Sequence, residues 1–158
     1  MPFAETTTVP VEKSRAEIET MVHRYGASQF FSGYDKSAAV IGFRCQDRTV
    51  KFILHMPDPT DKRFTEKRDG RSTVPKKMTP DQSRQAYEQE RRRLWRALAL
   101  SIKAKLEAVE SGIETFEQAF LAHVVLPNGE TVFQAVTPEI AECYKTGNQP
   151  KLLLGSGL

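Results

Sequence analysis

The chain has 158 residues, a formal net charge of +3, 39% hydrophobic residues and 27% charged residues. This length suits one domain with its own core, and the composition excludes an intrinsically disordered chain. No stretch approaches the roughly 20 apolar residues of a membrane span, and the first residues lack the apolar run of a signal peptide. Because Cys45 and Cys143 lie far apart, no disulfide framework is expected, which favours a soluble, cytoplasmic protein.

The N-terminal third predicts a helix followed by three strands. Residues 1–13 show no apolar period, so they are expected to form a flexible arm. Residues 14–17 (Ser-Arg-Ala-Glu) form a capping-box sequence that should begin a helix ending at Gly26. Alternating apolar residues then predict three strands, over residues 27–32, 37–45 and 48–56. Their short connections predict an antiparallel meander.

Residues 57–79 show no periodicity and are predicted to form a mobile basic loop. They contain seven basic and four acidic residues, an excess equal to the net charge of the whole chain. A loop of more than about 20 residues inside a compact domain is commonly functional or disordered.

A long amphipathic helix is predicted over residues 80–111, packed on the sheet. Thr79 and Gln82 form a capping box around Pro80, and Gly112 ends the helix. The rest of the chain predicts a short helix, a small hairpin, a last helix and a tail, over residues 115–122, 124–133, 137–146 and 148–158. The predicted fold is therefore an α+β domain over residues 14–147.

The long helix carries an apolar arc that two arginines interrupt. At about 100° per residue from Leu94, the apolar side chains span roughly 0° to 120°, with Trp95 at the edge and partly exposed. Arg84 and Arg91 fall inside this arc. They could overhang the sheet in solvent or pair with a neighbouring acid, or they could face a cleft, an anion or a partner.

No motif predicts catalysis, a metal or a cofactor. The three histidines, His23, His55 and His123, stand alone without metal-ligand spacing. No nucleotide-binding glycine loop and no hydrolase motif occurs, so we expect neither an enzyme nor a cofactor.

Basic residues interleaved with aromatic ones predict a nucleic-acid-binding site. The candidates are Lys62, Arg63, Lys67, Arg68, Arg71, Arg84, Arg91, Arg92, Arg93, Trp95 and Arg96. Arginines bind phosphates, aromatic rings stack on unpaired bases, and a sheet with an open face could serve as a platform for single strands. The alternative is an ordinary solvated surface, because the helix also carries several glutamates.

Much of the chain resembles a family of small, uncharacterised proteins from bacteriophages and prophages. The resemblance covers residues 96–113, 115–117, 120–129, 11–25 and 137–141. It implies a bacterial host cytoplasm and transfers no catalytic residue. It favours a non-enzymatic nucleic-acid-binding protein of phage DNA metabolism, such as a single-strand binding or annealing protein. The alternative is a protein-interaction module that inhibits a host protein, for example a defence protein. Self-association through the long helix is compatible with both.

Overall fold

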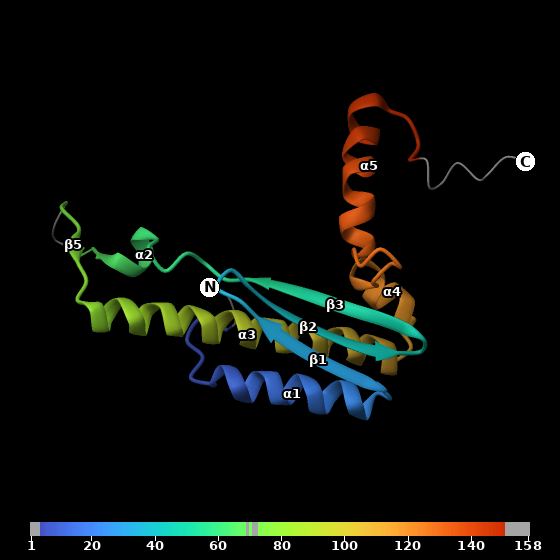
Figure 1. The fold of residues 1–158 in the computed structure, drawn as a ribbon, viewed down its shortest axis with the longest axis horizontal. Helices are drawn as coiled ribbons and strands as arrows, with labels where there is room; N and C mark the ends of the chain where they lie inside the picture. The colour runs from blue at the N-terminus through green and yellow to red at the C-terminus, as the bar shows by residue number, and fades with distance from the viewer. Residues whose placement is uncertain (1–3, 69, 71–72, 151–158) are drawn as a thin grey trace, which may run out of the picture.

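The computed structural model describes residues 4–68, 70 and 73–150, and it confirms the predicted α+β class (Figure 1). The elements in chain order are α1 (Val11–Arg24), β1 (Gln29–Tyr34), β2 (Ala38–Cys45), β3 (Arg48–His55), α2 (Lys62–Thr65), β4 (Glu66–Lys67), β5 (Lys76–Lys77), α3 (Pro80–Glu110), α4 (Phe116–Phe120), the 3-10 helix η1 (Leu121–His123) and α5 (Val132–Thr146).

The main sheet is the predicted antiparallel meander, in the order β1-β2-β3. The two-residue connection between β2 and β3 has Gln46 and Asp47 at positive φ, 49° and 58°. Such a turn matches the twist of the flanking strands and therefore fixes the register of this hairpin. The first strand is displaced from its predicted position at residues 27–32. It begins at Gln29 and continues through Tyr34, where a turn was expected.

The core lies on one face of this sheet. The strands contribute the alternating buried residues Ala39, Ile41, Phe43, Cys45, Val50 and Phe52, as predicted. Buried residues of α1, α3 and α4 complete the same cluster. On the opposite face Phe31 lies over Gly42 and is 43% exposed, while Lys51 donates a hydrogen bond to the carbonyl of Gly129 at 2.6 Å.

The buried stripe of α3 consists of Trp95, Ala99, Ile102 and Leu106. Its spacing of four, three and four residues centres it at about 110° on the helical wheel, roughly 50° from the centre of the predicted arc. Trp95 therefore lies in the core and is only 4% exposed, so the prediction of partial exposure is wrong.

The first helix begins at Val11 rather than at Ser14. Its first turn closes when the Ser14 amide donates to the carbonyl of Pro10 at 3.1 Å, and Pro10 precedes the helix in extended conformation. The predicted capping box is therefore not formed. Ser14 is instead fully buried inside α1, and its hydroxyl oxygen has no recorded hydrogen-bond partner among the described residues.

Replacement of Ser14 by alanine is expected to raise the free energy of unfolding by about 1 kcal/mol, because a buried hydroxyl without a partner keeps its desolvation penalty. Urea unfolding followed by Trp95 fluorescence would measure the change. Ser101→Ala is the matched control, since Ser101 is an exposed serine inside α3. If both variants gained the same stability, helix propensity rather than burial would explain the gain.

The described part of the predicted N-terminal arm packs against α3. Ala4 is buried, and Gln89 donates hydrogen bonds to the carbonyls of Glu5 and Thr7 at 3.2 and 2.9 Å. These contacts tie residues 4–7 to the long helix, where the sequence predicted a flexible arm.

Part of the predicted loop 57–79 is folded. Helix α2 is capped by Asp61, whose carboxylate accepts from the Arg63 amide, and β4 pairs with β5. Phe64 of α2 is 4% exposed and meets the Tyr87 ring of α3 edge to face, with centroids 5.5 Å apart. We call residues 62–77 the basic hairpin. Its helix α2 lies against the N-terminal half of α3, at the end that projects beyond the sheet (Figure 1).

The long helix and the short helix begin where the sequence predicts. The capping boxes Thr79–Gln82 and Thr115–Gln118 are both formed, and Gly112 has the left-handed conformation that ends α3, with φ of 72°. The predicted small hairpin is reduced to one bridge, between Val125 and Thr131, and Val124 bridges to Val50 of the main sheet.

The last helix begins at Val132, not at residue 137. Thr131 and Gln134 form a third capping box, and Pro138 lies inside α5. The capping box at Thr131 therefore starts the helix. The helix tolerates Pro138, which has no amide hydrogen and so leaves one backbone hydrogen bond unformed. Figure 1 shows α5 projecting away from the sheet, and none of its residues is buried. Of the predicted tail, residues 151–158 lie outside the described residues.

Candidate nucleic-acid interface

Most arginines of the α3 run are neutralised by carboxylates. The pairs are Arg91–Glu88 at 2.9 Å, Arg93–Glu90 at 2.7 Å and Arg96–Glu17 at 2.5 Å. All six side chains are at least partly shielded from solvent, which strengthens such pairs relative to fully exposed ones. The run therefore carries less available positive charge than its sequence suggests.

Two other candidate arginines of α3 behave differently. Arg84 is exposed and pairs with Asp81, so at this position the helix overhangs the sheet. Arg92 donates from Nε and Nη2 to the amide oxygen of Gln89, at 3.2 and 3.1 Å, and this neutral partner leaves its charge uncompensated.

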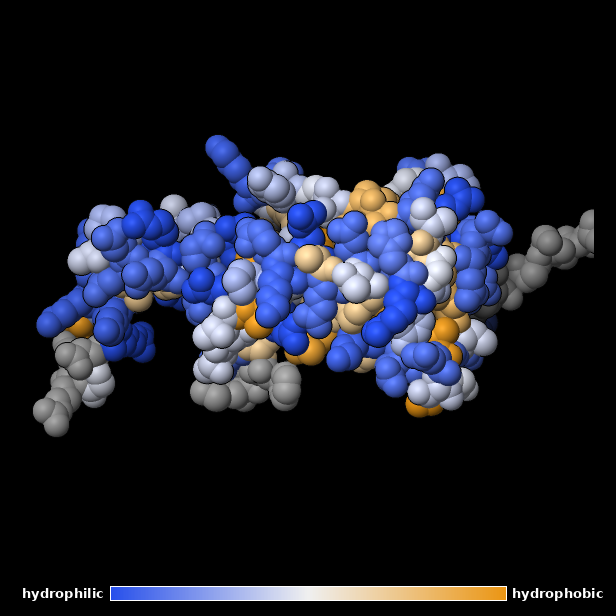
Figure 2. Space-filling view, turned by 90° about the horizontal axis from the view of Figure 1, so that it is seen from below, coloured by the Kyte–Doolittle hydropathy of each residue, from blue (hydrophilic) through white to orange (hydrophobic). Residues whose placement is uncertain are grey.

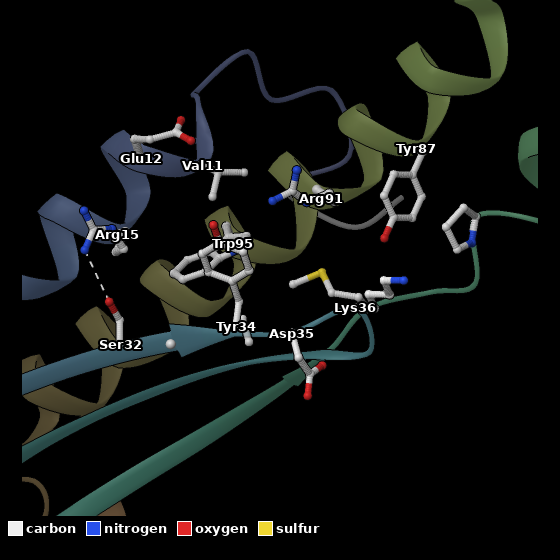
Figure 3. A pocket seen from close by; sticks show the side chains of 14 residues that line it. Val11, Glu12, Arg15, Ser32, Tyr34, Asp35, Lys36, Tyr87, Arg91 and Trp95 are labelled. Atoms are coloured by element: carbon white, nitrogen blue, oxygen red, sulfur yellow. Dashed lines mark hydrogen bonds between the residues drawn. The ribbon is translucent and has the colours of Figure 1, made fainter. Parts of the chain in front are cut away.

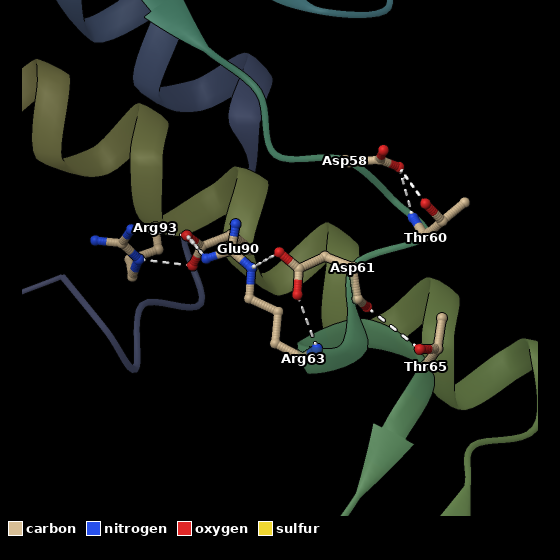
Figure 4. Close-up of polar contacts among 7 residues, drawn as sticks. All are labelled: Asp58, Thr60, Asp61, Arg63, Thr65, Glu90 and Arg93. Carbon is tan, nitrogen blue, oxygen red and sulfur yellow. Dashed lines mark hydrogen bonds and ion pairs between the residues drawn. The ribbon is translucent and has the colours of Figure 1, made fainter.

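Glu90 links α3 to the basic hairpin (Figure 4). Its carboxylate accepts two hydrogen bonds from Arg93 at 2.7 Å and lies 3.6 Å from Arg63 of α2. The hydrogen bond from Arg93 holds the pKa of Glu90 below its usual value, and the same bond raises the pKa of Arg93. Arg63 also pairs with Asp61 at 3.6 Å and lies over the Phe64 ring. Glu90 thus compensates Arg93 and shares Arg63 with Asp61.

The aromatic rings near these cations, Trp95 and Phe64, cannot stack on nucleic-acid bases. Trp95 lies in the core, and Phe64 is buried against Tyr87. Stacking requires an open ring face. The sequence pattern of basic residues interleaved with aromatic residues therefore predicted more stacking groups than the structure offers. Both rings instead pack inside the protein and hold the fold together.

Besides Arg92, the basic hairpin holds uncompensated positive charge. Its exposed cations are Lys62, Lys67, Arg68, Lys76 and Lys77. Within the described ranges, none of these five forms an ion pair. The pairing of β4 with β5 places Lys67 opposite Lys76 and Glu66 opposite Lys77, so this short ladder carries three cations and one acid. Arg71 lies outside the described residues. Figure 2 shows this end of the molecule as largely hydrophilic.

His123 does not add to this charge. Its ring is half-buried and stacks on Phe52 with centroids 4.1 Å apart. Burial, followed by the positive charge of Lys105, holds the pKa of His123 below its usual value, so the ring is neutral near pH 7. Cys45 and Cys143 are free thiols, and burial raises the pKa of Cys45. Over the ranges that the structure describes, no group of three or more His, Cys, Asp or Glu side chains could hold a metal ion.

The structure contains a cleft at one end of the sheet that the sequence did not predict (Figure 3). This cleft has a volume of about 890 Å³ and lies where α1, the end of β1 and α3 meet. Arg91 and Trp95 line it together. The only signal for this cleft in the sequence was the position of Arg91 inside the apolar arc of the long helix. That position left a cleft as one of the alternatives for Arg91 and Arg84. Arg84 does not line the cleft.

Comparison with known proteins finds no matching family model, curated protein or solved structure. The resemblance to phage proteins therefore stays a prediction. Among the described residues, no helix combines the length and the apolar character that crossing a bilayer requires.

Proposed function

We propose that the protein is a non-enzymatic nucleic-acid-binding protein that contacts the phosphate backbone through the basic hairpin. One observation carries this proposal. Five exposed cations of the hairpin have no ion-pair partner among the described residues, whereas the neighbouring arginines of α3 are mostly paired. Unpaired lysines and arginines on one short segment give the field that attracts a polyanion.

Binding through this hairpin rests on charge rather than on base contacts. Each cation that meets a phosphate releases condensed counterions, and this term is independent of sequence. Because the Trp95 and Phe64 rings are buried, they supply no stacking energy. We therefore expect little sequence preference, as in single-strand binding or annealing during phage DNA metabolism.

A salt titration tests the proposal. Fluorescence anisotropy with labelled 30-nucleotide single strands and 30-base-pair duplexes, between 50 and 300 mM KCl, gives the slope of log affinity against log salt. Five contacts at about 0.7 each predict a slope near −3.5 for single strands. An absence of binding to DNA and RNA at 50 mM KCl would overturn the proposal.

Replacement of Glu90 by glutamine is expected to strengthen nucleic-acid binding. Among the described residues it removes the only carboxylate paired with Arg93 and frees this guanidinium group beside the hairpin, while Arg63 keeps its pair with Asp61. One further contact at about 0.7 predicts a slope steeper by about 0.7.

The same salt titration measures this change. Glu114→Gln is the matched control, since Glu114 is exposed and its replacement changes the net charge equally. Equal affinities for the two variants would show that the pairing at Glu90 does not limit binding.

A second candidate function is a module that binds and inhibits a host protein, and α5 favours it. Phe133, Ile140 and Tyr144 lie on one face of α5 and are 61%, 44% and 90% exposed. Exposed apolar side chains that gather on one face are typical of contact surfaces. A pull-down from nuclease-treated bacterial lysate separates the candidates. A partner that is retained after nuclease and lost with Tyr144→Glu favours this one, and a partner lost after nuclease favours nucleic acid.

A further inference from the structure

The cleft beside Trp95 has the size and lining of a small-molecule site. Ligand sites commonly enclose about 300–1,000 Å³ and combine apolar walls with a few polar groups, and this cleft encloses about 890 Å³. The residues that matter to its chemistry are Val11, Arg15, Met56, Tyr87, Arg91 and Trp95. They come from α1, from the segment after β3 and from α3, so the tertiary fold alone assembles them.

The walls of the cleft are largely apolar. Figure 3 shows Tyr87 extending from α3 toward the β1–β2 turn and Trp95 lying between α3 and the sheet. Trp95 is almost fully buried, so a ligand would meet only the margin of its ring. Met56 and Val11 close other sides. Surfaces of this kind suit a flat, hydrophobic molecule.

Arg91 places a guanidinium at the apolar wall of the cleft, with N–H donors that no described residue uses, although Glu88 compensates its charge. Its side chain extends from α3 toward Val11 (Figure 3). Only Nη1 has a recorded hydrogen bond, to the two carboxylate oxygens of Glu88 at 2.9 and 3.2 Å. A guanidinium carries five N–H donors. Within the described chain the donors on Nε and Nη2 therefore remain available, and Glu88 does not line the cleft.

Besides Arg91, whose charge Glu88 compensates, the lining holds two cations, Arg15 and Lys36, and two acids, Asp35 and Glu12. Arg15 donates to the Ser32 hydroxyl at 3.2 Å, and Lys36 lines the mouth without an ion pair among described residues. Asp35 stays ionised, because hydrogen bonds from Ser37 and Ala38 hold its pKa below its usual value, but all three of these bonds satisfy Oδ1 within its own turn. Glu12 is the other acid in the lining.

We propose that this cleft binds a flat, largely apolar molecule with one negative charge, whose anionic group pairs with Arg91. Its apolar part lies against Tyr87, Met56 and the margin of Trp95. The site is separate from the proposed nucleic-acid surface, because no residue of the basic hairpin lines the cleft. Either proposal can therefore fail without the other.

The single tryptophan of the chain makes the test direct. The probe is 8-anilinonaphthalene-1-sulfonate, an aromatic anion that accepts excitation energy from tryptophan. Bound in the cleft, it lies beside Trp95, so saturable quenching of Trp95 emission should accompany the rise in dye fluorescence. N-phenyl-1-naphthylamine has the same rings without the sulfonate and should bind more weakly.

Arg91→Gln tests the charge. Loss of one charge-assisted hydrogen bond is expected to weaken binding of the sulfonate dye by about ten-fold and to leave binding of the neutral dye unchanged. Arg93→Gln is the control, since Arg93 is the adjacent paired arginine of α3 and does not line the cleft. Circular dichroism confirms that both variants are folded.

Three results would overturn the proposal. The sulfonate dye could fluoresce without quenching Trp95, which places it elsewhere, for example on α5. The two arginine variants could bind the dye equally, or the neutral dye could bind wild type as tightly as the anion. Each result would show that Arg91 does not form an anion site in this cleft.

Discussion

Replacement of Phe120 by alanine is expected to lower the free energy of unfolding by about 3–5 kcal/mol. The ring is fully buried at 0% exposure. It meets the rings of Phe43 and Phe52 edge to face, at 5.7 and 6.3 Å between centroids, and stacks on Phe116 at 4.8 Å. Because these contacts join α4 to the sheet, alanine would leave a cavity that neither side can close.

Urea unfolding followed by far-UV circular dichroism measures this loss. Leu121→Ala is the control, because Leu121 is the next residue and is 55% exposed. A surface substitution of this kind should change stability by no more than about 0.5 kcal/mol. A similar loss for both variants would mean that α4 is not held through the aromatic cluster.

A variant with glutamine at Lys67, Arg68, Lys76 and Lys77 is expected to lose between about 100-fold and 600-fold in affinity for single strands at 0.1 M salt. Each phosphate contact contributes about 0.7 to the salt slope, so four contacts account for up to 2.8 decades between 0.1 and 1 M salt. The slope should flatten toward −0.7, since only Lys62 of the five exposed cations would remain. Anisotropy titrations at several salt concentrations give both quantities.

The control has to lose the same charge elsewhere. Glutamine at Lys13, Arg24, Lys103 and Lys145, which are all exposed, also removes four positive charges and takes the formal net charge from +3 to −1. We expect this variant to lose less than about three-fold, because screening at 0.1 M salt limits exposed charges to about 10 Å. Equal losses for both variants would show that overall charge, and not the hairpin, drives binding.

The strands and most helix boundaries could be predicted from local sequence, because local chemistry sets them. Alternation predicted the buried face of β2, and the boxes at Thr79 and Thr115 predicted where α3 and α4 begin. The prediction failed where two local signals competed. Ser14 had a capping sequence but lies inside α1, and Thr131 begins a helix that the sequence analysis placed at Thr137. Tertiary packing decides between such signals.

The candidate site was less predictable because charge compensation and burial depend on the fold. The Arg93–Glu90 pair lies three residues apart on a helix and could have been anticipated. The pair between Arg96 and Glu17 could not, since it joins α3 to α1 across 79 positions. The burial of Trp95 required knowing how α3 is rotated against the sheet. Because the rotation of α3 was unknown, the sequence left a cleft as one of several alternatives for Arg91.

The length of α3 beyond the sheet has a consequence for how the protein opens. The 31-residue helix has its buried residues at Trp95 and beyond. Before Trp95 its neighbours include residues 4–7 and α2 of the basic hairpin, which contribute few buried side chains. Regions with few buried apolar contacts open at lower free energy than the core. Amide exchange is therefore expected to divide α3 near Trp95, with the first half opening in a local fluctuation and the second exchanging only on global unfolding.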